Sequence, residues 1–318
     1  MKIIIIVLYF GKLPANFNLW LNSCKKNKIV DWIFITDNIE IKIYEEKNFK
    51  VINTSLKNLK SKFEKVLKFE INLEKPYKLC DYKPAYGYLF KEEIKGYDFW
   101  GYCDIDLVFG KLENFLTEDL LTTYDKILRN GHFTLYRNTE NINEIFKQKI
   151  IKTLDYKKVY NTDISCGFDE SKKGVYGKSL EINKKQYLKK NFVDINPKIF
   201  NFLEKREKKA CYTYENGKIF SNILKKDKLE KKEILYIHFQ KRNIQCPNKI
   251  DTNLKYIISN KVISFDSEEE IIDYIKKIKN NILKDLYCLI KFYYQNIQNI
   301  VKFKYFYIKN LLKEGLEE

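Results

Sequence analysis

The segment from Gly96 to Leu112, GYDFWGYCDIDLVFGKL, constrains the fold of this chain more than any other. Phe99 to Cys103 are apolar and rich in aromatic side chains, which is typical of a short buried strand. Asp104 and Asp106 follow, and a second apolar run begins at Leu107. Side chains two residues apart on an extended backbone point the same way. The two carboxylates therefore repel each other unless a cation or hydrogen-bond donors offset them. A divalent ion that holds a substrate's phosphates meets this need; the alternative is a pair of solvated aspartates that end a strand.

Composition narrows the class of protein. The 318 residues are 45% hydrophobic, enough for a real core, and the length suggests two domains or one large α/β domain with additions. The 59 basic and 42 acidic residues give a net charge of +17, which favours anionic partners such as nucleotides, nucleic acid or an acidic membrane surface. Because the lysines are scattered, a solubilising surface explains most of them, and nucleic acid is not expected as the main partner.

Cysteine usage and hydropathy indicate a cytoplasmic protein. The seven cysteines are odd in number and form no CxxC pair, which fits a reducing compartment. The apolar run after Lys2 is too short for a signal peptide. A run of about 18 apolar residues, which a membrane-spanning helix requires, is absent.

The N-terminal half alternates strand and helix patterns, which indicates an α/β nucleotide-binding sheet. Buried strands are expected at Ile3–Phe10, Trp32–Ile35 and Phe49–Ile52, and helices at Phe17–Cys24 and Leu56–Leu73. Ligands bind beyond the carboxyl ends of such strands. The residues at these ends are Tyr9, Phe10, Gly11, Thr36, Asp37, Asn53, Thr54, Asp104 and Asp106.

A basic and aromatic segment, KLCDYKPAYGYLF, starts at Lys78. Its Lys83 is a candidate for a phosphate contact and its Asp81 for a sugar hydroxyl, although an ordinary charged loop has the same composition. Farther on, the pattern predicts a strand at Gly131–Arg137, a helix at Asn141–Leu154 and a mobile loop between Ser165 and Lys178.

Several residues in the second half are candidates for a site. His238 ends an apolar strand and precedes Lys241 and Arg242, so it is a candidate third metal ligand, with the two basic residues offsetting phosphate charge. His132 is interpreted as a core or edge residue. Asp169 and Glu170, which precede a glycine-bearing loop, are candidates for the general base that activates an acceptor hydroxyl.

The C-terminal part is expected to be helical from Ser267 onward. Between Tyr287 and Leu312 aromatic side chains alternate with lysines, which is typical of a helix on an anionic membrane surface. The alternative is a helix that packs on the main domain with its lysines outward. We therefore divide the chain into a domain at 1–250 and a helical extension at 251–318.

Several enzyme classes are excluded by missing motifs. The sequence has no GxSxG and only two histidines, which argues against a hydrolase triad. It has neither a P-loop nor a GxGxxG motif, which excludes P-loop NTPases and argues against nicotinamide enzymes.

The segments IIIIVLYFGKLP, DWIFITD, KLCDYKPAYGYLF, GYDFWGYCDIDLVFGKL and HFQKR resemble bacterial capsule and lipopolysaccharide glycosyltransferase-like proteins. This group is a domain of unknown function that is itself similar to GT-A glycosyltransferases, and the resemblance covers roughly residues 1 to 245. It implies a GT-A-like (Rossmann-like) mixed sheet flanked by helices, a nucleotide-sugar donor, usually UDP-linked, and Mn²⁺ or Mg²⁺.

The resemblance also implies roles for single residues. Asp104 would contact the ribose or sugar and the metal, and Asp106 and His238 would bind the metal. Tyr9, Phe10, Thr36 and Asp37 would line the uridine pocket, and Lys83 would meet the donor sugar or phosphate. Asp169 or Glu170 would stand on the acceptor side, where the usual acidic signature is not clear, so the stereochemistry stays open.

The sequence thus favours a metal-dependent glycosyltransferase that moves a sugar from a nucleotide donor to a capsular or lipopolysaccharide acceptor, a polysaccharide or a lipid-linked saccharide. It is expected in the cytoplasm, at the inner face of the membrane. One alternative is a nucleotidyl- or phosphotransferase, which also needs paired aspartates. The other is a non-catalytic binding protein that uses the basic charge.

Overall fold

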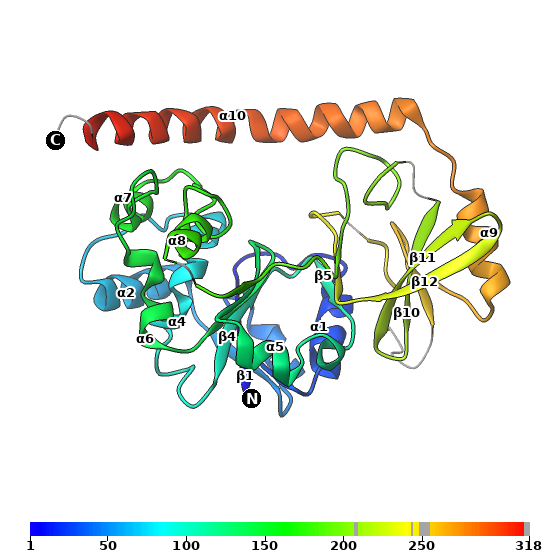
Figure 1. Ribbon diagram of the computed structural model, residues 1–318, viewed down its shortest axis with the longest axis horizontal. Helices are drawn as coiled ribbons and strands as arrows, with labels where there is room; N and C mark the ends of the chain where they lie inside the picture. The colour runs from blue at the N-terminus through cyan, green and yellow to red at the C-terminus, as the bar shows by residue number, and fades with distance from the viewer. Residues whose placement is uncertain (183, 207–208, 243, 248–254, 315–318) are drawn as a thin grey trace.

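A computed structural model of the protein describes residues 1–182, 184–206, 209–242, 244–247 and 255–314 (Figure 1). Its largest element is a seven-stranded sheet in the order β3-β2-β1-β4-β7-β6-β8. Strands β1 to β4 are parallel, β7 is antiparallel to β4 and to β6, and β8 is parallel to β6. The strands are β1 (Ile3–Tyr9), β2 (Val30–Thr36), β3 (Phe49–Asn53), β4 (Phe99–Cys103), β6 (Lys126–Asn130), β7 (Phe133–Arg137) and β8 (Gln186–Tyr187).

The first strand is buried on both faces, as its uninterrupted β-branched sequence predicts. Ile3, Ile5 and Val7 pack with Trp20 on one face of the sheet, while Ile4 and Ile6 belong to a second cluster on the other face. This alternation follows from the two-residue period of a strand. Because β1, β2, β3 and β4 are parallel, their carboxyl ends lie along one edge of the sheet.

The helices are short in the first two thirds of the chain and long at its end. They are α1 (Phe17–Lys26), α2 (Leu56–Leu67), α3 (Leu79–Tyr82), α4 (Tyr86–Leu89), α5 (Glu118–Thr123), α6 (Glu140–Asn143), α7 (Tyr156–Asn161), α8 (Val175–Glu181), α9 (Glu268–Lys277) and α10 (Ile282–Glu314).

Three expectations about helices and loops were wrong in extent. The helix predicted to reach residue 73 ends at Leu67, because Lys68 adopts a left-handed conformation with φ 62°. The helix predicted at 141–154 is reduced to α6 and a 3-10 turn at Ile145–Lys147. The stretch predicted to be a mobile loop before Lys178 contains the first half of α8, which begins at Val175.

Two smaller sheets complete the molecule. The five-stranded sheet β12-β11-β10-β14-β15 contains β10 (Ala210–Glu215), β11 (Lys218–Lys225), β12 (Lys228–Ile234), β14 (Tyr256–Ile258) and β15 (Ile263–Ser264). The three-stranded sheet β5-β13-β9 contains β5 (Leu107–Phe109), β9 (Val193–Asp194) and β13 (Tyr236–His238). The predicted α/β class, a mixed sheet flanked by helices with a helical C-terminal extension, is confirmed. Strands on both sides of residue 250 share the five-stranded sheet, and the division into domains remains a prediction.

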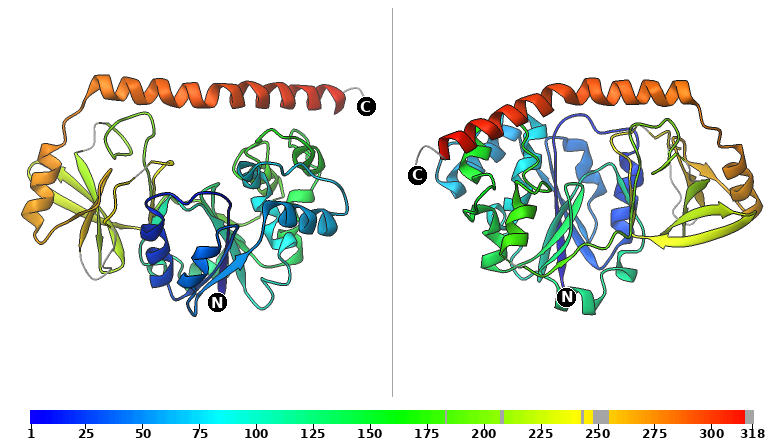
Figure 2. Two further views of the ribbon diagram at one scale, coloured as in Figure 1. Left: turned by 180° about the vertical axis from the view of Figure 1, so that it is seen from behind. Right: turned by 45° about the horizontal axis from the view of Figure 1, so that its top comes forward.

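Helix α10 lies across one side of the molecule (Figures 1 and 2). It runs from α9 and the five-stranded sheet to the region of α7 and α8, and both views of Figure 2 show the same course. Within the described residues, none of the helices combines the length and the apolar character needed to cross a membrane.

Candidate metal and nucleotide site

A cavity of about 420 Å³ lies at the carboxyl edge of the large sheet, beyond β1 and β4. Tyr9 and Phe10 line one side of it, and Asp104 and Asp106 another. Its volume lies within the range of pockets that hold small molecules and cofactors. The ends of β1, β2, β3 and β4 were all expected at the ligand. The cavity is lined mainly by the ends of two of these strands, β1 and β4.

The two aspartates of the motif have different partners. The Asp104 backbone N–H donates to the carbonyl of His132 (3.0 Å), and one Asp104 carboxylate oxygen accepts a bond of 2.6 Å from Lys83 Nζ. The Asp106 carboxylate accepts a bond of 2.7 Å from the backbone N–H of Lys241 and lies 3.5 Å from His238 Nε2. The repulsion expected between the carboxylates is thus offset by one cation on each side.

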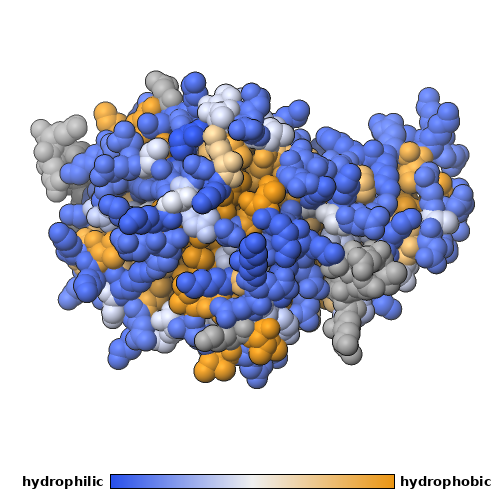
Figure 3. All heavy atoms as spheres, turned by 90° about the horizontal axis from the view of Figure 1, so that it is seen from below, coloured by the Kyte–Doolittle hydropathy of each residue, from blue (hydrophilic) through white to orange (hydrophobic). Residues whose placement is uncertain are grey.

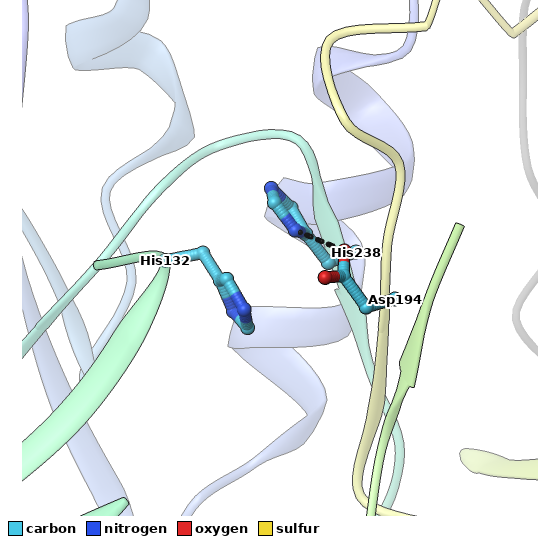
Figure 4. Close-up of side chains that lie close together, drawn as sticks. All are labelled: His132, Asp194 and His238. Atoms are coloured by element: carbon cyan, nitrogen blue, oxygen red, sulfur yellow. Dashed lines mark hydrogen bonds and ion pairs between the residues drawn. The ribbon is translucent and has the colours of Figure 1, made fainter. Parts of the chain in front are cut away.

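Strand pairing explains how His238 reaches the motif. Strand β5 follows Asp106 directly and pairs antiparallel with β13, so that His238 lies opposite Leu107. Strand β9 pairs with β13 on the other side and places Asp194 opposite His238. Asp194 Oδ1 lies 2.8 Å from His238 Nδ1 (Figure 4). The imidazole is therefore held between Asp194 and Asp106.

This position controls the charge of His238. Burial lowers the pKa of the imidazole, but its bonds to Asp106 and Asp194 outweigh burial and raise the pKa to about 10. Burial likewise raises the pKa of Asp106, but the bonds from His238 and Lys241 outweigh it and lower that pKa to about 2. Without a metal ion, His238 is an imidazolium between two carboxylates.

His132, interpreted from sequence as a core or edge residue, packs directly on His238. The two rings are stacked with centroids 4.1 Å apart and planes 24° apart (Figure 4). His132 is 8% exposed, and its Nδ1 has no hydrogen-bond partner among the described residues. Burial and the charge of His238 lower its pKa to about 3, so the ring is neutral. The burial of His132 agrees with the interpretation from sequence, whereas Asp194 was missed, because no local pattern marks it.

The three predicted ligands fit a divalent ion. Asp104, Asp106 and His238 each offer one ligand atom, and these atoms lie within 4.8 Å of one another. Two carboxylates and an imidazole are ligands that several divalent ions accept. Asp194 accepts the bond from Nδ1 and directs Nε2 toward Asp106, the arrangement that commonly orients metal-binding histidines. The ligand atoms of His238, Asp194 and His132 also lie within 4.8 Å of one another, so His238 belongs to two groups of candidate ligands.

The structure gives the basic segment after Lys78 two different roles. Lys83 is buried, lines the cavity and donates to Asp104 and to the carbonyl of Gly131, both at 2.6 Å. Burial lowers the pKa of Lys83, but the charge of Asp104 outweighs it and raises the pKa above its ordinary range. Asp81, considered for a sugar hydroxyl, is instead fully buried in an ion pair with Lys78 (2.8 Å).

Of the four residues expected at the nucleoside, two line the cavity. Tyr9 and Phe10 do so, and the Tyr9 hydroxyl donates to the carbonyl of Lys12. Thr36 is fully buried, and Asp37 accepts a bond of 2.9 Å from the N–H of Gly11. Gly11 has φ +100°, a conformation that favours glycine. In the described part of the chain, Asp37 therefore shapes the loop after β1 rather than the cavity wall.

The two basic residues after His238 also differ. Both line the cavity, and Lys241 Nζ lies 4.3 Å from the centre of the Tyr77 ring. The Arg242 guanidinium donates to the carbonyls of Asn196 (2.7 Å) and Phe200 (2.9 Å), so most of it is occupied within the protein. Lys241 is the better placed of the two for a phosphate.

Asp169 and Glu170 belong to the loop before α8, which packs against the turn at Gly131 that precedes β7. Glu170 accepts a bond of 2.7 Å from the N–H of Gly131, and Asp169 accepts one of 3.0 Å from the N–H of Glu170. Asp169 is buried, which raises its pKa to about 7. Neither is among the described residues that line the cavity. The Asp169 carboxylate nevertheless interacts with the charges of Lys83 and Asp104, so Asp169 lies beside the site rather than in the cavity wall.

Comparison with known proteins identifies a family. Residues 5–266 match a family of unknown function, DUF6625. The chain belongs to this family. No curated protein matches the sequence. The resemblance noted from the motifs is confirmed to this extent, and a role in capsule or lipopolysaccharide synthesis remains a proposal.

Solved structures show only distant likeness. The apo-form glycosyltransferase GlyE of Streptococcus pneumoniae is 13% identical, with 58% of this chain and 45% of that chain covered and a TM-score of 0.33. Mouse xyloside xylosyltransferase 1 is 10% identical, with 61% and 87% covered and a TM-score of 0.32. The bifunctional IspDF of Campylobacter jejuni is 10% identical, with 59% and 49% covered and a TM-score of 0.30. The chain thus spans less than half of GlyE and of IspDF.

Proposed function

We propose that this DUF6625 protein is a GT-A-like, metal-dependent glycosyltransferase that uses a nucleotide-sugar donor, UDP-linked in the first instance. The observation that carries the proposal is that the ligand atoms of Asp104, Asp106 and His238 cluster, and that both aspartates line a cavity at the carboxyl edge of parallel strands. Such edges are where α/β sheets bind nucleotides. Two aspartates that only ended a strand would need neither the nearby imidazole of His238 from β13 nor the Asp194 carboxylate that binds this imidazole.

The proposed roles follow from the contacts of each residue. Asp104, Asp106 and His238 would hold Mn²⁺ or Mg²⁺, which when bound supplies positive charge to a leaving diphosphate. Tyr9 and Phe10 present aromatic surface to the nucleoside, and Lys241 offers a cation at the cavity wall. Lys83 holds the Asp104 carboxylate at the cavity wall through its bond of 2.6 Å. Asp37 would act indirectly, by holding the loop after β1 through Gly11, and Thr36 by holding the loop after β2 through Asn38.

The acceptor we propose is a capsular or lipopolysaccharide saccharide, free or lipid-linked, on the cytoplasmic side of the membrane. Among the described residues of the cavity, Asp104 and Asp106 are the only acids. Asp169 or Glu170 would therefore serve as general base only for an acceptor that approaches the Gly131 turn from outside the cavity.

Thermal unfolding with nucleotides tests the proposal, because a ligand that binds only the folded state raises the melting temperature. We would compare UDP, GDP, CDP and CMP, each with and without Mn²⁺, on wild type, Asp106→Asn and the exposed control Asp266→Asn. The expected result is a rise with UDP that needs Mn²⁺, persists in Asp266→Asn and is lost in Asp106→Asn. No rise with any nucleotide, or an unchanged rise in Asp106→Asn, would refute the site assignment.

The same pair of carboxylates is also compatible with a nucleotidyl- or phosphotransferase. That alternative predicts consumption of a nucleoside triphosphate, which phosphorus NMR of the reaction would detect. Release of UDP from a UDP-sugar, without loss of triphosphate, favours the glycosyltransferase.

A further inference from the structure

Helix α10 is attached to the rest of the protein near both of its ends. At its start, Asp285 is buried in an ion pair with Arg206 (2.9 Å) and accepts a bond of 2.7 Å from the N–H of Phe200. Toward its end, Phe303 and Tyr307 pack on the second core cluster, and Lys173 Nζ lies 3.0 Å from the centre of the Tyr307 ring. These contacts all use one face of the helix and hold its rotation about its own axis.

A second face of α10, centred about 120° around the helix from these contacts, is apolar and exposed. Twelve large apolar side chains between Ile282 and Ile308 are at least 44% exposed. At about 100° per residue they all fall within an arc of about 140°, and the stripe is about 40 Å long. Its centre line is Leu283, Ile290, Ile297, Val301 and Ile308. An apolar stripe that points away from the core is the reverse of the arrangement that stabilises a surface helix.

The distribution of charge along α10 indicates which kind of partner covers this face. Lys284, Lys291, Lys302 and Lys309 are exposed and follow one edge of the stripe, and Lys304 lies within it. The helix contains two acids, the buried Asp285 and the terminal Glu314. Two copies packed through this face would bring lysines together with no carboxylates along the seam to pair with them, which disfavours a coiled coil. An anionic lipid surface complements both the stripe and its basic edge.

The tyrosines of the stripe agree with a lipid surface. Tyr287, Tyr294 and Tyr305 lie toward the edge of the arc that the lysines follow, where amphipathic rings meet the headgroups. The opposite side of the molecule is different, since Figure 3 shows mostly hydrophilic residues there, with apolar ones in separate patches.

Helix α10 and the carboxyl edge of the large sheet, where the cavity lies, are on the same side of the molecule. Strand β1 runs from the N-terminus toward the side on which α10 lies, so the carboxyl edge of the sheet faces that side (Figures 1 and 2). We propose that the outer face of α10 lies flat on an anionic membrane and thereby directs the cavity toward acceptors at the bilayer surface. The acceptor part rests on the proposed function, whereas the membrane part does not.

The decisive test is sedimentation with vesicles that contain no substrate. Vesicles would be phosphatidylcholine alone or phosphatidylcholine with about one third phosphatidylglycerol. Wild type is expected to sediment with the anionic vesicles and to be released by salt. Ile297→Asp should lower the partition coefficient by about tenfold or more, because one inserted isoleucine is lost and a charge is introduced.

A matched control and a second variant make the test specific. Ile29→Asp changes an exposed isoleucine directly before β2, at the edge of the sheet opposite its carboxyl edge, and should bind as wild type does. A triple Lys291→Gln, Lys302→Gln, Lys309→Gln variant should lose the preference for phosphatidylglycerol while keeping its helix content by circular dichroism.

Two outcomes would overturn the proposal. One is equal vesicle binding by wild type and Ile297→Asp. The other is a dimer, measured by light scattering, that Ile297→Asp dissociates, because a second copy then covers the stripe. Nucleotide-dependent thermal shifts are independent of vesicles, so a failed membrane test and a failed donor test are distinguishable.

Discussion

Lys126 offers a quantitative test of the core beside the candidate site. This residue of β6 is 1% exposed, and its Nζ has no hydrogen-bond partner in the described structure. The rings of Tyr136 and Tyr176 lie 5.1 and 5.8 Å from it. Burial lowers the pKa of Lys126 from 10.5 to about 7, although the charge of Asp169 opposes the shift.

The sign of the effect on stability follows from proton binding. Between pH 7 and pH 10.5 the unfolded chain holds a proton on Lys126 that the folded chain has lost, so stability rises with pH in this window. At 1.36 kcal/mol per unit, the whole shift amounts to roughly 5 kcal/mol of destabilisation at pH 7 and below. Replacement by methionine, which is similar in size and uncharged, removes this penalty.

We therefore expect Lys126→Met to raise the free energy of unfolding at pH 7 by several kcal/mol, with a gain that shrinks as the pH approaches 10.5. Urea unfolding at several pH values measures it, and the exposed Lys50→Met of β3 is the control. The difference between variant and wild type cancels the other groups that titrate in this range. A constant difference from pH 7 to pH 10.5 would show that Lys126 keeps its proton in the folded state and would refute the reasoning.

Three further predictions concern the site and α10. Asp106→Asn should abolish metal-dependent release of UDP from a UDP-sugar with little change in urea unfolding at pH 7; an active variant would refute the metal assignment. Asp194→Asn should weaken Mn²⁺ binding by about 10- to 100-fold in calorimetry, because His238 loses the carboxylate that orients it; unchanged affinity would make Asp194 a purely structural residue. Truncation before Ile282 should abolish vesicle binding and also lower the melting temperature, because it uncovers the partners of Phe303 and Tyr307; an equally stable truncated protein would contradict the packing of α10 on the core.

Local sequence determined much of the large sheet and part of the site. The β-branched run at Ile3–Val7 buries both faces of a strand wherever it folds, so a central parallel strand followed from residue types alone. Asp104 and Asp106 were recognisable because an apolar strand delivers them at a spacing that places both on one side. The long C-terminal helix and its amphipathic character were also visible as a period in the sequence.

Tertiary structure alone decided which distant residues complete the site and which do not. Pairing of β5 with β13 and β9 brings His238 and Asp194 to the motif, and no local pattern encodes such long-range pairing. The same packing turns Glu170 to the backbone of Gly131 and Arg242 to loop carbonyls, although both look available in the sequence. It also decided that α10 packs through one face and leaves the other apolar and exposed, because side-chain periodicity shows that a helix has two faces but not which of them the core covers.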